Sequence, residues 1–254
     1  MSSILCSALG VQVNSRFKSM RSVPIVLALP ILILACSTRG SGSLSNAHTL
    51  EALSLHLGRD SFIVRFSGLP DGFHTHEYVA TPRGFRYSSV VRLGDMLVQE
   101  AEVQLDSSMF VMLARSTTQI GARQGNSEMT YLGRRARGTA VPVQATVPGR
   151  VSIDTVLPPG AFDGLALYPV LLSQHWEVGD VDTLTIFDTD ELSITRQVLR
   201  VIGLEGIAFG AAQTPALRAE LSSTQLPVTL WFTESRPHRL LKVASASGES
   251  ILVP

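Results

Sequence analysis

Apolar and polar residues alternate along most of the chain from residue 60 onward, with the two-residue period of β-strands. Phe62, Val64 and Phe66 share one face of the first such segment, and residues 68–72 follow it with the Gly, Pro and Asp typical of turns. The same pattern predicts strands over residues 76–80, 85–93, 96–105, 109–114, 128–134, 140–145, 181–187, 192–202, 207–209, 216–222, 228–233, 240–244 and 251–253. Because short loops join them, we expect an antiparallel meander rather than the strand–helix alternation of a nucleotide-binding fold.

Two segments depart from simple alternation. Residues 109–114 are apolar on both faces, which is typical of a central strand. Residues 161–172 are apolar around more than half of a helical circumference, so we expect one buried helix there, broken or bent at Pro169. The predicted fold class is therefore mainly β, with a single curved antiparallel sheet wrapped around one apolar helix. It forms one domain over residues 50–254, in which residues 50–57 fit either a helix or a strand.

The first 35 residues have the order of a bacterial signal peptide. Basic residues precede an apolar run at residues 23–35, and small residues follow it. As a helix this run would span about 20 Å, short of a hydrocarbon core of roughly 30 Å. Residues 33–36, Ile-Leu-Ala-Cys, resemble the lipobox of bacterial lipoproteins, in which the cysteine is acylated and becomes the mature N-terminus.

This resemblance implies a membrane-anchored protein. We expect a lipoprotein-type signal peptide over residues 1–35, lipidation of Cys36, and a flexible tether over residues 36–49 that is rich in Ser and Gly. An uncleaved signal anchor is the alternative, and translation could start at Met1 or Met20. In lipoproteins of two-membrane bacteria an aspartate after the cysteine marks retention in the inner membrane. Ser37 stands there instead, so the resemblance implies the periplasmic face of the outer membrane.

The C-terminal part of the chain, about 90 of its 254 residues, carries a second resemblance. From Leu165 an apolar helix leads through Gly179-Asp180 to a strand ending at residues 186–188, then to a long strand and to a strand around Trp231. This order resembles periplasmic β-domains of unknown function, related in architecture to the lipoprotein carrier and receptor group. The resemblance implies a half-open barrel over a helix, with a groove for a lipid or another hydrophobic ligand. The side chains expected to line that groove are Phe110, Met112, Leu167, Leu171 and Trp231.

Charge and cysteine content narrow the function classes. The chain has 21 basic and 21 acidic residues, and this balance gives no support to a nucleic-acid partner. Residues 134–137 form the one basic run, which would either meet lipid phosphates or only aid solubility. Of the two cysteines, Cys6 lies in the predicted leader, so Cys36 would be the sole thiol and no internal disulfide is expected.

Two groups of residues are candidates for metal binding. His74 and His76 occupy alternate positions and therefore share one face of a strand, where they would bind zinc or copper or remain an exposed pair. A cluster of acidic residues could supply oxygen ligands to calcium, but it lacks the alternating ligands and central glycine of a calcium loop, which favours a solvated turn. Its members are Asp180, Asp182, Asp188, Asp190 and Glu191.

No nucleophile motif of the Gly-x-Ser-x-Gly type and no phosphate-binding loop occurs in the sequence. We therefore predict a non-catalytic protein without a cofactor that binds a hydrophobic ligand. The alternative is a structural or assembly module of the cell envelope that binds a protein partner. A third hypothesis is a periplasmic hydrolase or metal-dependent enzyme, which would need a pocket where His74 and His76 meet a carboxylate.

Overall fold

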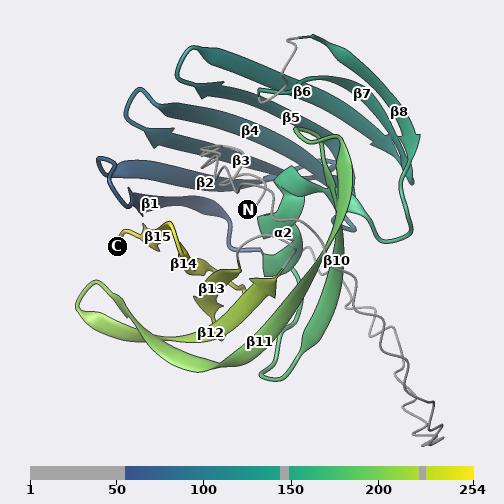
Figure 1. Ribbon diagram of the computed structural model, residues 1–254. Helices are drawn as coiled ribbons and strands as arrows, with labels where there is room; N and C mark the ends of the chain where they lie inside the picture. The colour runs from purple at the N-terminus through teal and green to yellow at the C-terminus, as the bar shows by residue number, and fades with distance from the viewer. Residues whose placement is uncertain (1–54, 144–148, 223–226) are drawn as a thin grey trace, which may run out of the picture. The chain divides into compact units, whose positions relative to one another are not determined.

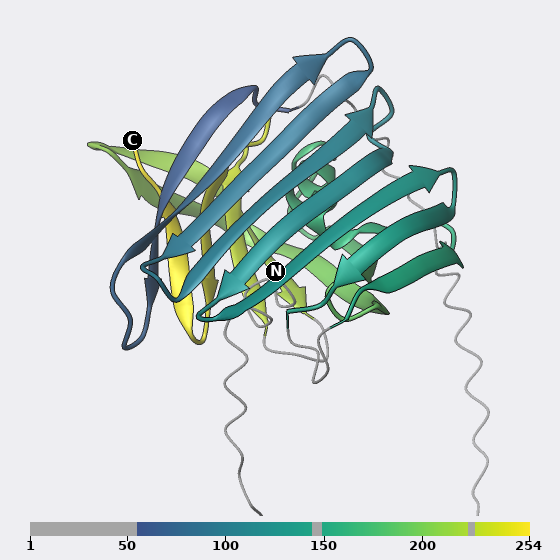
Figure 2. The ribbon, with the colours of Figure 1, turned by 90° about the horizontal axis from the view of Figure 1, so that it is seen from above.

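The computed structural model describes residues 55–143, 149–222 and 227–254, and these residues form one large β-sheet. Its 15 strands are ordered β8-β7-β6-β5-β4-β3-β2-β1-β15-β14-β13-β12-β11-β10-β9. Figures 1 and 2 show the sheet curving around the side on which the short helix α2 lies. Neighbouring strands are antiparallel except for the parallel pair β9 and β10, and the sheet is open because its end strands β8 and β9 do not pair with each other.

The strand bounds are β1 Gly58–Phe66, β2 Gly72–Thr81, β3 Gly84–Leu93, β4 Leu97–Asp106, β5 Val111–Ile120, β6 Arg123–Leu132, β7 Arg135–Val141, β8 Val151–Val156, β9 Phe162–Asp163, β10 Val181–Asp188, β11 Ser193–Phe209, β12 Ala212–Ser222, β13 Val228–Thr233, β14 Leu240–Ser245 and β15 Gly248–Leu252. The predicted mainly-β class and the mostly antiparallel order are confirmed. Most predicted strands are present with shifted ends. Strand β8 was not predicted, because its apolar residues are largely exposed and give no one-sided pattern.

Strand β11 corrects one predicted break. The sequence suggested that the strand ends near Gly203 and that residues 207–209 form a separate one. Instead β11 runs through 17 residues and pairs with β12 as far as Phe209. The register shifts between Val201 and Gly203, so Ile202 is the extra residue of an irregularity of the β-bulge kind and the strand continues through Gly203.

The predicted central strand over residues 109–114 is only partly correct, because residues 111–114 begin strand β5 but residues 109 and 110 do not belong to it. Met109 has a φ of 64° and belongs to a turn in which the Asp106 carboxylate accepts the backbone N–H groups of Ser108 and Phe110. Strand β5 starts at Val111 and continues through a polar stretch to Ile120. The apolar run is thus partly a turn, and the polar half of the strand was missed.

The helix is shorter than predicted. Residues 161–172 contain β9, a 3-10 turn at Gly164–Ala166 and the six-residue helix α2 at Leu167–Leu172. The Asp163 carboxylate starts the 3-10 turn by accepting the Leu165 N–H at 2.8 Å. Pro169 does not break the helix, because it lies in the first turn of α2, where a backbone N–H has no helical partner.

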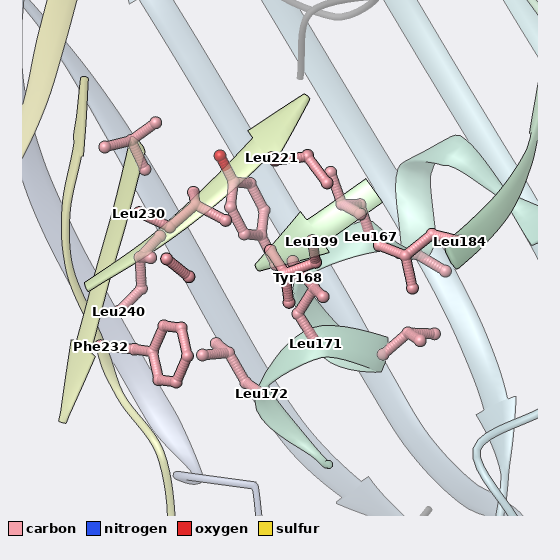
Figure 3. Close-up of a cluster of buried hydrophobic side chains, with 14 of the residues drawn as sticks. Leu167, Tyr168, Leu171, Leu172, Leu184, Leu199, Leu221, Leu230, Phe232 and Leu240 are labelled. Carbon is pink, nitrogen blue, oxygen red and sulfur yellow. The ribbon is translucent and has the colours of Figure 1, made fainter. Parts of the chain in front are cut away.

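The main core fills the space between α2 and the sheet (Figure 3). Every residue of α2 is buried, which confirms its apolar character. Four side chains of the helix face six from strands β10 to β14. The members of this group are Leu167, Tyr168, Leu171, Leu172, Leu184, Leu199, Leu221, Leu230, Phe232 and Leu240. Strands β10 to β14 therefore hold the helix. They position its first turn over the strands from the N-terminal part of the sheet.

The predicted signal peptide and tether, including Cys36, lie outside the described residues. Of residues 50–57, Leu55 forms an isolated parallel bridge with His238, so the described end of that segment is extended. In the part of the chain that the structure describes, no helix has the length and apolar character needed to cross a membrane.

Candidate ligand-binding cleft

A cleft opens on the inner face of the sheet, beside the 3-10 turn and the first turn of α2. Atoms leave about 740 Å³ empty between its walls, a figure that includes the open solvent at its mouth. The walls come from six strands and the helical segment. The lining residues are Val64, Phe66, His74, Tyr87, Ser89, Val91, Leu97, Gln99, Ala101, Gly164, Leu165, Tyr168, Val243, Ser245, Gly248, Glu249 and Ser250.

One wall of the cleft is apolar. Val64, Phe66, Val91 and Leu97 belong to a small cluster of buried side chains that is separate from the main core. The Phe66 ring lies so close to Gly248 that a Cβ atom at residue 248 would come within 2.5 Å of it. The absence of a side chain at residue 248 thus allows the Phe66 ring to approach the backbone of β15.

Neutral polar side chains line the other side. The Ser89 hydroxyl hydrogen-bonds His74 Nε2 at 2.9 Å, and the Tyr87 hydroxyl in turn bonds Ser89. The Gln99 amide donates to the Thr118 hydroxyl at 3.4 Å. These groups are fixed by strands β2 to β5, whose registers place them all on the inner face. The cleft therefore combines an apolar wall with hydrogen-bonding groups.

His74 and His76 form a buried pair, which corrects the expectation of exposed histidines. Their Nε2 atoms lie 2.7 Å apart, and the Tyr168 ring packs 4.8 Å from the His76 ring. Burial lowers the pKa of His74 to about 3. Burial and the neighbouring His74 lower the pKa of His76 as well. Both rings are thus neutral at pH 7, and one Nε2–H donates to the other nitrogen.

The geometry of this pair is that of a hydrogen bond rather than of a metal site. Two imidazoles bound to one tetrahedral zinc at about 2.0–2.1 Å would hold their nitrogens roughly 3.3 Å apart. Among the described residues, no group of three or more His, Cys, Asp or Glu side chains could hold a metal ion. Asp60, which is opposite His76 in the register, is bound by Arg239 at 2.7 Å.

The same contacts bear on the hydrolase hypothesis. Ser89 and His74 have the separation of a nucleophile and its base. In a catalytic triad the third residue bonds the opposite nitrogen of the imidazole and orients it. Here His76 bonds the same Nε2 that faces Ser89, so it competes with the serine instead of orienting the base.

None of the five side chains predicted to line a groove lines this cleft. Phe110 is 66 % exposed, in the turn before β5, and Met112 is half-buried. Leu167 and Leu171 lie in the main core. Trp231 is buried beside Glu205, to which its Nε1–H donates at 2.9 Å. The observed lining comes from alternate positions of strands, a pattern already visible at Val64 and Phe66 in the sequence.

The acidic cluster is neither fully solvated nor arranged around a cation. The Asp188 carboxylate accepts the backbone N–H groups of Asp190 and Glu191 and so shapes the turn after β10. Asp163, fully buried, is bound by the Tyr131 hydroxyl from β6. Burial raises the pKa of Asp163 to about 6. Burial and then the charges of Asp188, Asp163 and Glu191 raise the pKa of Asp190 to about 6.

The basic run is engaged in contacts within the protein. Arg135 and Arg137 both bind Asp154 of β8, at 2.7 and 3.2 Å. Arg134 donates from Nε to the Leu157 carbonyl at 2.8 Å. These contacts hold the edge strand β8 against β7 and give the run a structural role in addition to its two predicted ones.

Comparisons with known proteins support the fold alone. No family model matches the sequence, and no match is found among curated proteins. A solved structure, the beta-barrel-like protein of domain of unknown function DUF1849 from Brucella abortus, is similar with a TM-score of 0.50 at 11 % identity, over 78 % of this chain and 97 % of that chain. The chain thus has a β-barrel-like fold, built as one open curved sheet of 15 strands with one short helix.

Proposed function

We propose that this chain is a non-catalytic lipoprotein of the outer membrane, facing the periplasm, whose half-open barrel binds a hydrophobic ligand. The observation that supports this most is the cleft, because it combines an apolar wall with a few convergent polar groups, the usual make-up of a small-molecule site.

The membrane anchor of the proposal rests on the sequence around Cys36. Acyl chains on one cysteine supply stable anchoring when two or more are attached. Labelling cells with radioactive palmitate tests this part. The wild-type chain should carry label and sediment with outer membranes, and Cys36→Ser should lose both properties. A wild-type chain without label would refute the anchor and leave the cleft unaffected.

Ligand binding is tested by native mass spectrometry of the full chain after extraction in mild detergent. The expected result is a second mass peak from a copurified lipid-sized molecule. A matched pair of variants locates it. Val91→Trp fills the cleft and should remove the adduct, whereas Val98→Trp, one strand away on the outer face, should retain it. A wild-type spectrum without any adduct, even after incubation with lipid extract, would refute ligand binding.

A structural module of the cell envelope is the second candidate, and the edge strand β8 favours it. Val156 of β8 is 61 % exposed, and among the described residues only β7 pairs with this strand. Such an edge can accept a strand from another protein. A photo-crosslinker at the exposed Ser152 distinguishes the two functions. A single envelope protein captured there would support the module, and no captured protein would refute it.

A further inference from the structure

The polar groups of the cleft indicate what kind of head group it can accept. The described lining residues include one charged side chain, Glu249, and no Lys or Arg. The Glu249 side chain is on the outer face of the sheet, opposite Arg65 in the register, where Lys242 at 2.8 Å and Arg65 at 3.5 Å bind it. An anionic head group inside the cleft would therefore find no cation as a partner.

The histidine pair does not supply a cation either. The short contact between His74 Nε2 and His76 Nε2 requires one of the two nitrogens to be an unprotonated acceptor. Both rings are also buried, 4 % and 1 % exposed, which disfavours a further proton on either Nδ1 atom because it would create a buried charge. His74 and Ser89 therefore meet the cleft as neutral hydrogen-bonding groups.

One polar atom of the lining lacks a partner. Ser250 is only 4 % exposed, and within the described part of the chain its Oγ has no hydrogen-bond partner. Its register opposite Val64 places it on the inner face, between the apolar residues Val243 and Val64. A buried hydroxyl without a partner is unfavourable, so a ligand that bonds it gains stability from this atom.

Resting on the proposed function, we infer that the cleft binds an uncharged single-chain amphiphile, an acyl chain with a hydroxyl or glycerol-ester head, and rejects ionised fatty acids and lysophosphatidates. The chain lies along Val64, Phe66 and Leu97, and the head bonds neutral groups of the lining. Burial of an ionised carboxylate or phosphate without a cation is strongly unfavourable, whereas a neutral hydroxyl both donates to and accepts from such groups.

Native mass spectrometry of the full chain with an equimolar mixture of 1-monoolein, oleyl alcohol, oleate and oleoyl-lysophosphatidate at pH 7.5 tests the inference. The expected result is that the two neutral ligands exceed the two anions by at least about ten-fold. Oleate or lysophosphatidate bound as well as monoolein would overturn the inference and leave the proposed function intact. No adduct from any of the four would overturn both.

A matched pair of serine variants locates the head group. Ser250→Ala should lower the occupancy of monoolein about three- to ten-fold, as expected for one lost hydrogen bond. Ser61→Ala changes an exposed serine on the outer face of β1 and should leave the occupancy unchanged. Thermal unfolding of both variants shows whether the fold is intact. Equal monoolein occupancy in folded Ser250→Ala and in wild type would overturn the role of Ser250.

Discussion

Replacing Asp190 with Asn should stabilise the protein at neutral pH and have no effect in acid. Asp190 is largely buried near Asp188, Asp163 and Glu191, and these surroundings raise its pKa from 3.8 to about 6. The folded chain therefore holds a proton on Asp190 more tightly than the unfolded chain does. As pH rises from about 4 to 6, the unfolded carboxyl ionises first, so the free energy of unfolding falls through this window. The cost is absent below pH 4 and complete above pH 6.

The magnitude follows from the size of the shift. Each pKa unit corresponds to about 1.4 kcal/mol, so a shift of about two units costs at most about 3 kcal/mol at pH 7.5. Asn removes the charge with little change in shape, and the turn contact from the residue-190 backbone N–H to Asp188 remains. For a chain of this size, 1–3 kcal/mol corresponds to a rise in Tm of roughly 2–12 °C.

The assay is thermal unfolding followed by circular dichroism at pH 4, 5, 6 and 7.5. The difference in Tm between Asp190→Asn and wild type should be close to zero at pH 4 and grow up to pH 7.5. Asp95→Asn, at an exposed turn outside the cluster, is the control and should show no such growth. A variant that is less stable than wild type at every pH, or a difference that does not change with pH, would refute the electrostatic reasoning.

Four further substitutions test the packing and one buried hydrogen bond. Tyr131→Phe removes the hydroxyl donor to buried Asp163 and should cost about 1–3 kcal/mol in urea unfolding, more at pH 7.5 than at pH 5, because only the ionised carboxylate needs that donor strongly. Leu171→Ala leaves a cavity in the main core and should lower the free energy of unfolding by about 2–5 kcal/mol. Phe110→Ala, at an exposed turn, is the control and should change it by no more than about 0.5 kcal/mol. Equal losses in the two variants would contradict the burial of Leu171 and the exposure of Phe110. Gly248→Ala places a methyl group 2.3 Å from the Arg65 carbonyl oxygen and 2.5 Å from the Phe66 ring, and it should cost about 1–3 kcal/mol and reduce ligand binding. An unchanged Tm would show that β1 and β15 can separate enough to accept the methyl group.

Strands were predictable where the inner face of the sheet is apolar. In β1 the buried side chains Phe62, Val64 and Phe66 alternate with outward ones, and the sequence shows this directly. In β5 the inner positions include Ser116 and Thr118, so burial and hydrophobicity do not coincide and the pattern fails. These inner polar groups are satisfied by side chains of neighbouring strands, since Ser116 hydrogen-bonds Ser127 and Thr118 accepts from Gln99. A single segment of sequence does not reveal such pairing between strands.

The residues of the cleft could likewise be predicted from the sequence only in part. The sequence placed His74 and His76 on one face of a strand, which is confirmed by their contact. It did not show that Tyr168, more than ninety residues further along the chain, would cover them. The predicted groove relied on continuous apolar runs, but such runs became a turn at Phe110 and core at Leu171. The lining of the cleft is assembled from alternate residues of several strands, so it depends on the order in which the strands pair. The hydrophobic pattern of one segment predicts only the residues that this segment contributes.

The adjacency of β1 and β15 has a consequence for the order of folding. Phe62 pairs with Leu252, so the central seam of the sheet joins residues from opposite ends of the described chain. The hairpins from β1 to β8 can form as the chain emerges, but the free edge of β1 stays unsatisfied until the last strand has been synthesised. Closing so long a loop is slow, and exposed edges aggregate in the meantime. Truncation of the final six residues should therefore produce insoluble protein rather than a slightly shortened soluble one.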